Sequence, residues 1–192
     1  MRKRCATVLL VGTLAACGDA GRRDAAPTVD TAGVATQDTA SAATAAGKAT
    51  AAMRDSAGKD LGTLTLSDSG RSIAVSGRLT GLPRGEHAIH LHTAGQCDAP
   101  KFEGAGDHWN PTNKQHGRNS PGGPHLGDLP NLTVAQNGSV SVQATTPGGT
   151  LRGANAALDS DGAAVVVHAK RDDYKTQPSG DSGDRIACGV VK

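Results

Sequence analysis

Seven histidines are the residues of this chain whose type and spacing could do chemistry. They are His87, His90, His92, His108, His116, His125 and His168. His90 and His92 stand two residues apart in residues 85–92, a segment typical of a strand, so their side chains point to the same face. Such a pair can hold one metal ion through two imidazoles. His87 shares the opposite face with apolar side chains, and we interpret it as a hydrogen-bonded core histidine outside the ligand set.

A second set of candidate ligands follows in a segment rich in proline and glycine. Its members, spaced by 8, 9 and 3 residues, are His108, His116, His125 and Asp128. Three imidazoles and one carboxylate make a closed tetrahedral shell for zinc, and a metal could supply the ordering energy that this segment lacks. His168 ends an apolar run, where a further imidazole could join His90 and His92. The spacing predicts metal sites but does not give the reaction.

Short strands are expected to position these side chains. The runs that alternate or are continuously apolar are residues 63–66, 72–76, 132–134, 140–142, 163–168 and 186–191. Asn137-Gly138 lies between two of them and is a strong signal for a hairpin. No segment has a sustained helical period, and 26 glycines favour turns. The expected fold class is therefore all-β, an antiparallel sandwich or barrel.

Two intervals break this rhythm of strands, at residues 93–130 and 169–185. Long loops in a compact domain are usually functional, and the histidines lie in these two or beside them. The sequence therefore predicts that both loops help to build the metal site.

Residues 1–17 have the three parts of a targeting signal. A basic start precedes an apolar stretch too short to span a bilayer. The closing Leu14-Ala15-Ala16-Cys17 resembles a bacterial lipobox, which implies cleavage before Cys17 and a lipid on its sulfur. The alternative is an ordinary secretory signal with a cysteine at its end. Residues 18–48 have few large apolar side chains, so we expect a flexible tether rather than an Ala-rich helix. The folded domain is then expected at residues 49–192.

The charge balance argues against a nucleic-acid partner. The whole chain has 20 basic and 18 acidic residues, but three basic residues lie in the expected signal. The rest of the chain is nearly neutral and has no basic stripe of the kind that nucleic-acid binders show.

Five runs of the expected domain resemble the copper/zinc superoxide dismutases, specifically their bacterial envelope branch of lipoproteins. They are residues 85–92 (GEHAIHLH), 105–111 (AGDHWNP), 125–129 (HLGDL), 166–174 (VVHAKRDDY) and 185–190 (RIACGV). The resemblance implies a Greek-key β-sandwich or flattened barrel with two long functional loops. It also implies dismutation of superoxide to dioxygen and hydrogen peroxide by a redox-cycling copper, bridged through a histidine to a structural zinc.

The resemblance also implies roles for single residues. Copper would take His90, His92, His108 and His168, and zinc would take His108, His116, His125 and Asp128. His108 would bridge the two ions. Asp172 would link a copper histidine to a zinc histidine, and Arg185 would attract and position superoxide beside copper. Cys97 and Cys188 would form the family's disulfide, which a non-cytosolic compartment permits.

The expected partners follow from the same resemblance: superoxide as substrate, a membrane reached through a lipid anchor at Cys17, and a homodimer as one assembly that the family admits. The expected location is the bacterial cell envelope, facing the periplasm or the exterior. Asp107 and Asp184 are acidic where small neutral residues are usual in the family. Asp184 directly precedes Arg185 and is expected to slow the enzyme, with Lys175 as a candidate compensating charge.

Two other functions compete with this interpretation. A non-enzymatic envelope protein that binds copper and zinc would need the ligands but not Arg185. A structural, zinc-stabilised adhesion or interaction domain would explain the second ligand set, but not His90, His92 and His168. The presence of Arg185 and of all four copper ligands favours the dismutase.

Overall fold

The computed structural model describes residues 47–192, which form nine strands and one short 3₁₀ turn. The strands are β1 (Lys48–Asp55), β2 (Asp60–Ser69), β3 (Ser72–Leu79), β4 (Gly85–His87), β5 (Ile89–His92), β6 (Leu132–Val134), β7 (Val140–Thr145), β8 (Ala164–His168) and β9 (Arg185–Val190). The turn, η1, spans Glu103–Ala105. The all-β fold class predicted from the sequence is confirmed in this part of the chain.

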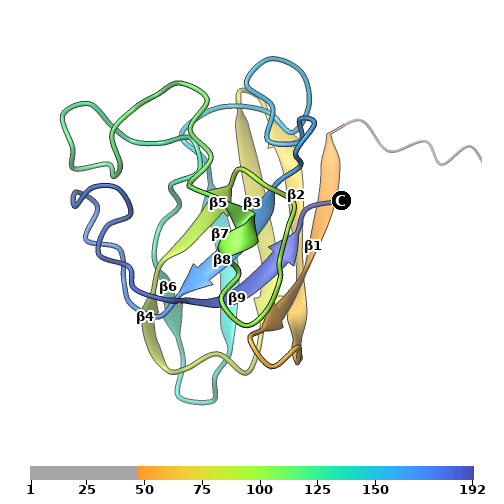
Figure 1. Ribbon diagram of the computed structural model, residues 1–192. Helices are drawn as coiled ribbons and strands as arrows, with labels where there is room; N and C mark the ends of the chain where they lie inside the picture. Colours follow the sequence, from red (N-terminus) through yellow and green to blue (C-terminus); the bar gives the residue numbers. More distant parts are fainter. Residues whose placement is uncertain (1–46) are drawn as a thin grey trace, which may run out of the picture. The chain divides into compact units, whose positions relative to one another are not determined.

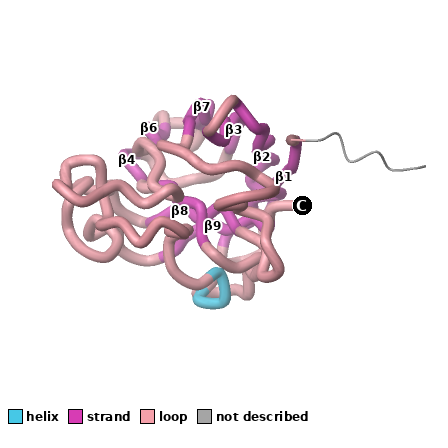
Figure 2. Tube along the Cα trace, turned by 90° about the horizontal axis from the view of Figure 1, so that it is seen from above, coloured by secondary structure: helices cyan, strands magenta, loops and turns pink. Residues whose placement is uncertain are grey.

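The strands form a curled antiparallel sheet (Figures 1 and 2). Seven strands follow the order β5-β8-β9-β1-β2-β3-β7, and β4 pairs with β6 in a separate two-stranded sheet. Several neighbours, such as β5 and β8 or β3 and β7, are far apart along the chain. Such neighbours need the long return connections that define Greek-key topology. This arrangement places the histidines of β5 directly beside the end of β8.

The core is built almost entirely from aliphatic side chains. In β2 and β3 the alternation seen in the sequence is the alternation of burial, with Leu64, Leu66, Ile73 and Val75 all pointing inward. Trp109, from the loop after β5, is packed against the same cluster. The long loops are therefore anchored on the core at their bases, although they carry few apolar side chains of their own.

Two local predictions about strands are wrong. The chain does turn at residues 137–138, where the Ala135 N–H donates to the Ser139 carbonyl at 2.9 Å. However, β6 pairs with β4 and β7 pairs with β3, so the turn joins two sheets instead of closing a hairpin. The segment 85–92 is also not one strand. It breaks at Ala88, whose backbone bonds to Lys170 and His168, and its two halves pair with different partners.

Both long loops that the sequence predicted are present, as residues 93–131 and 169–184. They lie on the same side of the molecule in Figure 1 and are joined by hydrogen bonds. A third connection without strands, residues 146–163, was not predicted. No helix in the described part of the chain is long and apolar enough to cross a bilayer. The predicted signal, Cys17 and nearly all of the predicted tether lie outside the described residues.

Candidate metal centre

The second ligand set converges on one carboxylate oxygen. Asp128 Oδ1 lies 3.0 Å from Nδ1 of His108, 3.1 Å from Nδ1 of His116 and 3.3 Å from Nδ1 of His125. The other oxygen, Oδ2, accepts the backbone N–H groups of Gly117 and His125 at 2.8 and 3.0 Å. All four side chains are buried. Three ring nitrogens and one oxygen therefore face a common point, which is the donor set that zinc prefers.

The first ligand set comes from the edge of the sheet. His90 and His92 lie on β5, His168 ends β8, and His108 approaches from the loop that follows β5. One nitrogen from each of these buried rings falls within 4.8 Å of the others. Four imidazoles suit copper. As expected, His87 lies outside both sets, with its two ring nitrogens 2.8 and 2.9 Å from backbone carbonyl oxygens.

The hydrogen bonds of His92 and His168 fix which nitrogens are free. His92 Nδ1 donates to the Gly106 carbonyl at 2.9 Å, and His168 Nδ1 donates to the Gly183 carbonyl at 3.2 Å. A neutral imidazole carries only one N–H, so each Nε2 bears a lone pair. These two Nε2 atoms face each other at 3.4 Å. Two lone pairs directed at each other repel, and a cation between them would remove the conflict.

Asp172 connects the two sets. Its Oδ2 accepts the Nε2–H of His90 at 3.0 Å, and its Oδ1 accepts the Nε2–H of His116 at 2.9 Å. Such a carboxylate fixes the tautomer and the orientation of each ring. In both histidines Nδ1 is then the atom left to bind a metal.

Three buried nitrogens have no hydrogen-bond partner within the described residues: His90 Nδ1, His108 Nε2 and His125 Nδ1. Leaving a buried polar atom unpaired costs about 1–3 kcal/mol. Each of the three belongs to one of the two ligand sets, so bound ions would satisfy all of them. The residues fit a copper ion and a zinc ion, with His108 offering Nε2 to the first set and Nδ1 to the second.

The surroundings of the first ligand set lower the pKa values of its histidines and so keep their rings neutral. Burial, with nearby His108 acting in the same direction, lowers the pKa of His90 to about 3. Burial also lowers the pKa of His168 to about 4 and that of His92 well below its usual value. These rings are therefore neutral at pH 7, as metal ligands must be.

His116 differs because it lies between two carboxylates. Burial alone would lower the pKa of His116, but its hydrogen bonds to Asp128 and Asp172 outweigh burial and raise that pKa to about 9. Burial likewise disfavours the charged form of Asp128, yet hydrogen bonds from His108 and His116, with the His125 ring close by, hold the pKa of Asp128 well below its usual range. A metal bound at His116 Nδ1 would replace the proton there.

Arg185, at the start of β9, is held beside the first set. It donates from Nη1 to the Phe102 carbonyl at 2.7 Å and from Nη2 to the Gly106 carbonyl at 2.6 Å. The Gly106 carbonyl also accepts from His92, so the guanidinium and a candidate copper ligand share one acceptor. Burial lowers the pKa of Arg185, and the charges of Asp107 and Glu103 oppose that shift. The guanidinium stays charged at any physiological pH.

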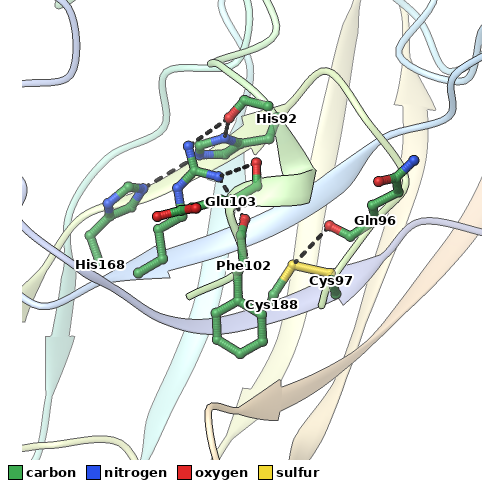
Figure 3. The surroundings of a disulfide bond; sticks show 9 residues. His92, Gln96, Cys97, Phe102, Glu103, His168 and Cys188 are labelled. Carbon is green, nitrogen blue, oxygen red and sulfur yellow. Dashed lines mark hydrogen bonds between the residues drawn. A yellow bond between two sulfur atoms is a disulfide. The ribbon is translucent and has the colours of Figure 1, made fainter. Parts of the chain in front are cut away.

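A disulfide anchors the loop that supplies these carbonyl groups. Cys97 and Cys188 are bonded, with Cα atoms 5.6 Å apart. Figure 3 shows the bond next to the Phe102 ring, with His92 and His168 on the other side of the Phe102 carbonyl. Phe102 and Cys188 are both buried in one small cluster. The pairing that the resemblance implied is therefore present.

The carboxylates that act on the pKa of Arg185 are Asp107 and Glu103. The expected effect of Asp184 on the reaction stays a prediction. Asp184 lines a surface hollow of about 530 Å³ together with Arg185, Glu103 and Lys101. Glu103 forms an ion pair with Lys101 at 3.7 Å, whereas Asp107 has no ion pair within residues 47–192. Lys175, the candidate compensating charge, is exposed.

Three supporting residues escaped the sequence analysis: Asn131, Gln177 and Gly180. Asn131 donates from Nδ2 to the Asp172 carbonyl at 2.9 Å and accepts the Asp172 N–H at 2.8 Å. Gln177 bonds to the backbone of His116, and Gly180 lies against the Asp172 carboxylate. Only their position in the predicted functional loop 169–185 could have pointed to Gln177 and Gly180, and Asn131 lies just outside the predicted loop 93–130.

The comparison with known proteins gives the family. Residues 61–191 match the family model described as copper/zinc superoxide dismutase. A curated protein from Caulobacter vibrioides named "Superoxide dismutase [Cu-Zn]" is 40% identical over 148 residues, covering 75% of this chain and 85% of that protein. The chain belongs to the copper/zinc superoxide dismutase family.

Solved structures agree with this assignment. A SOD-like protein from Bacillus subtilis superposes with a TM-score of 0.71 at 36% identity, covering 74% of this chain and 97% of that one. The Cu/Zn superoxide dismutase from Brucella abortus superposes with a TM-score of 0.62 at 27% identity, covering 76% and 99%.

Proposed function

We propose that this chain is an enzyme that converts two superoxide anions and two protons into dioxygen and hydrogen peroxide. The proposed copper ligands are His90, His92, His108 and His168, and the proposed zinc ligands are His108, His116, His125 and Asp128. The observation that carries the proposal is the pair of complete, buried four-ligand sets that share His108. Family membership supports the same reaction and the same two metals.

Copper, when bound, would supply the electron transfer, since zinc has no redox chemistry. The chain's own residues bind, orient and supply protons. Arg185 attracts the anion and holds it beside the first set, and its two carbonyl contacts keep the guanidinium in place. His108 would offer Nδ1 to zinc, which leaves Nε2 as the ring atom that could accept a proton. Asp172 keeps the rings of His90 and His116 in the orientation that binding requires.

The decisive test is the decay of superoxide followed by pulse radiolysis on the protein loaded with copper and zinc. We expect rapid second-order decay that is lost in His168→Ala, with metal content measured on both proteins. The absence of decay at full copper occupancy would contradict the proposal. It would favour the alternative, a non-enzymatic protein of the envelope that binds copper and zinc.

We further propose that the chain is exported and tethered to a membrane of the bacterial envelope, facing the periplasm or the exterior. The pattern of residues 1–17, read as a lipoprotein signal, supports a lipid on Cys17, and residues 18–48 suit a flexible tether. The disulfide between Cys97 and Cys188 suits an oxidising compartment. Mass spectrometry of the membrane-extracted protein would detect the lipid, and an unmodified Cys17 would contradict the anchor. Light scattering on the purified protein would test a homodimer.

A further inference from the structure

The loop between β8 and β9 carries a side-chain amide that grips the backbone of a proposed zinc ligand. Gln177 Oε1 accepts the N–H of His116 at 2.8 Å, and Gln177 Nε2 donates to the carbonyl of His116 at 3.0 Å. The same Nε2 donates to the Lys175 carbonyl at 3.0 Å, which closes the amide onto its own loop. Gln177 thus satisfies both backbone groups of one residue, as a neighbouring strand would do in a sheet.

His116 has no other regular structure to hold it. It lies in a stretch of turns without strand or helix, and the next residue, Gly117, has a positive φ of 87°. The loop 169–184 therefore holds His116 twice. Asp172 holds the ring at Nε2, and Gln177 holds the backbone. Together they direct His116 Nδ1 toward Asp128.

We propose that Gln177 is a positioning residue for the zinc site. By fixing the backbone of His116 it presets one ligand, and it couples zinc binding to the order of the loop 169–184. This inference rests on the proposed assignment of zinc to the set that contains His116. Coupling between two equilibria is reciprocal. The factor by which zinc shifts the loop toward its ordered state should therefore equal the factor by which the ordered loop strengthens zinc binding.

Two substitutions separate the contributions of the two hydrogen bonds between Gln177 and the His116 backbone. Gln177→Ala removes the two hydrogen bonds that Gln177 makes to the His116 backbone and leaves the one from the Ser120 hydroxyl to the His116 carbonyl. Gln177→Glu keeps the acceptor for the His116 N–H but places a carboxylate oxygen opposite two carbonyl oxygens. The matched control is Gln143→Ala, because Gln143 is an exposed glutamine on β7 whose side chain has no hydrogen bond within residues 47–192. The dissociation constant for zinc is measured by competition with a chromophoric chelator.

We expect zinc binding to weaken about tenfold in Gln177→Ala, the lower end of the range for residues that support metal ligands. Gln177→Glu should weaken it at least as much, and Gln143→Ala should leave it unchanged. Hydrogen exchange of the amides in residues 174–183 should slow when zinc binds to the wild type, and this protection should shrink in Gln177→Ala. Dissociation constants within twofold of the wild type would overturn the inference.

Thermal unfolding distinguishes positioning from simple stabilisation. In the metal-free protein, Gln177→Ala should melt close to the wild type, and only the rise in Tm on adding zinc should be smaller. An equal loss of Tm with and without zinc would overturn the inference. A His125→Ala variant that binds zinc as tightly as the wild type would instead overturn the zinc assignment itself, and the role of Gln177 with it.

Discussion

Gly180→Ala should damage the metal centre although residue 180 binds no metal. Gly180 is buried in the loop 169–184 and has a positive φ of 72°. A Cβ built there would overlap Asp172 Oδ1 and lie 2.7 Å from His116 Nε2. The alanine therefore cannot coexist with the hydrogen bond between Asp172 and His116.

Two costs add up in this variant. An alanine in the left-handed backbone region costs roughly 1–2 kcal/mol of folding free energy. Displacing a carboxylate that orients a metal ligand typically weakens metal binding about 10–100-fold, or ~1.4–2.8 kcal/mol. The first cost, together with the lost hydrogen bond between Asp172 and His116, lowers the free energy of unfolding of the metal-free protein. The second cost is measured as weaker zinc binding.

Gly70→Ala isolates the first cost. Gly70 has a similar φ of 65° in the turn between β2 and β3, and a Cβ there would meet nothing within 4 Å. Urea unfolding of the metal-free proteins should show the backbone cost in both variants. Chelator competition should show weaker zinc binding in Gly180→Ala alone. Equal zinc affinities in the two variants would refute the argument that Asp172 supports the zinc ligand His116.

Two further predictions concern the surroundings of Arg185. Replacing both Cys97 and Cys188 with alanine should lower the free energy of unfolding of the metal-free protein by roughly 4–5 kcal/mol, because the disulfide closes a loop with a sequence separation of 91. A loss below about 1 kcal/mol in urea unfolding would contradict this expectation. Asp107→Asn should raise the rate of superoxide decay at low salt about twofold, because an exposed charge near Arg185 repels the incoming anion through water by roughly 0.5 kcal/mol. The gain should vanish in 1 M salt, where screening acts within about 3 Å. An Asp184→Asn variant that gains more than Asp107→Asn would contradict the assignment of Asp107 as the stronger opposing charge.

Part of each ligand set could be predicted from a short-range rule, and the complete sets were implied by the family resemblance. His90 and His92 share a face because strand side chains alternate, and β5 does place both in the first set. The closing Asp128 follows His125 by three residues, close enough for the His125 N–H to bond to the Asp128 carboxylate. The fold class followed from alternation in the same way, since β2 and β3 bury the residues that the pattern selected.

Long-range pairing could not be predicted in this way. The turn at residues 137–138 has the local chemistry of a hairpin, but the partners of β6 and β7 are chosen by the two sheets. Gln177 bonds to His116, 61 residues away, and no local pattern marks a side chain that will meet a distant backbone. The role of Gly180 likewise depends on Asp172 being folded against it.

The two metal sites are built on elements of unequal stability. The first set stands mainly on β5 and β8, which pair along their length and bury a continuous apolar face. The second set stands entirely on a loop that has few apolar residues, so its order depends on hydrogen bonds and on the metal. Asp172 ties the two together, because its oxygens bind one ring from each. Loss of zinc should therefore loosen the loops and release Asp172 before it disturbs the strand histidines. Copper binding would then persist while the positioning of His90 deteriorates.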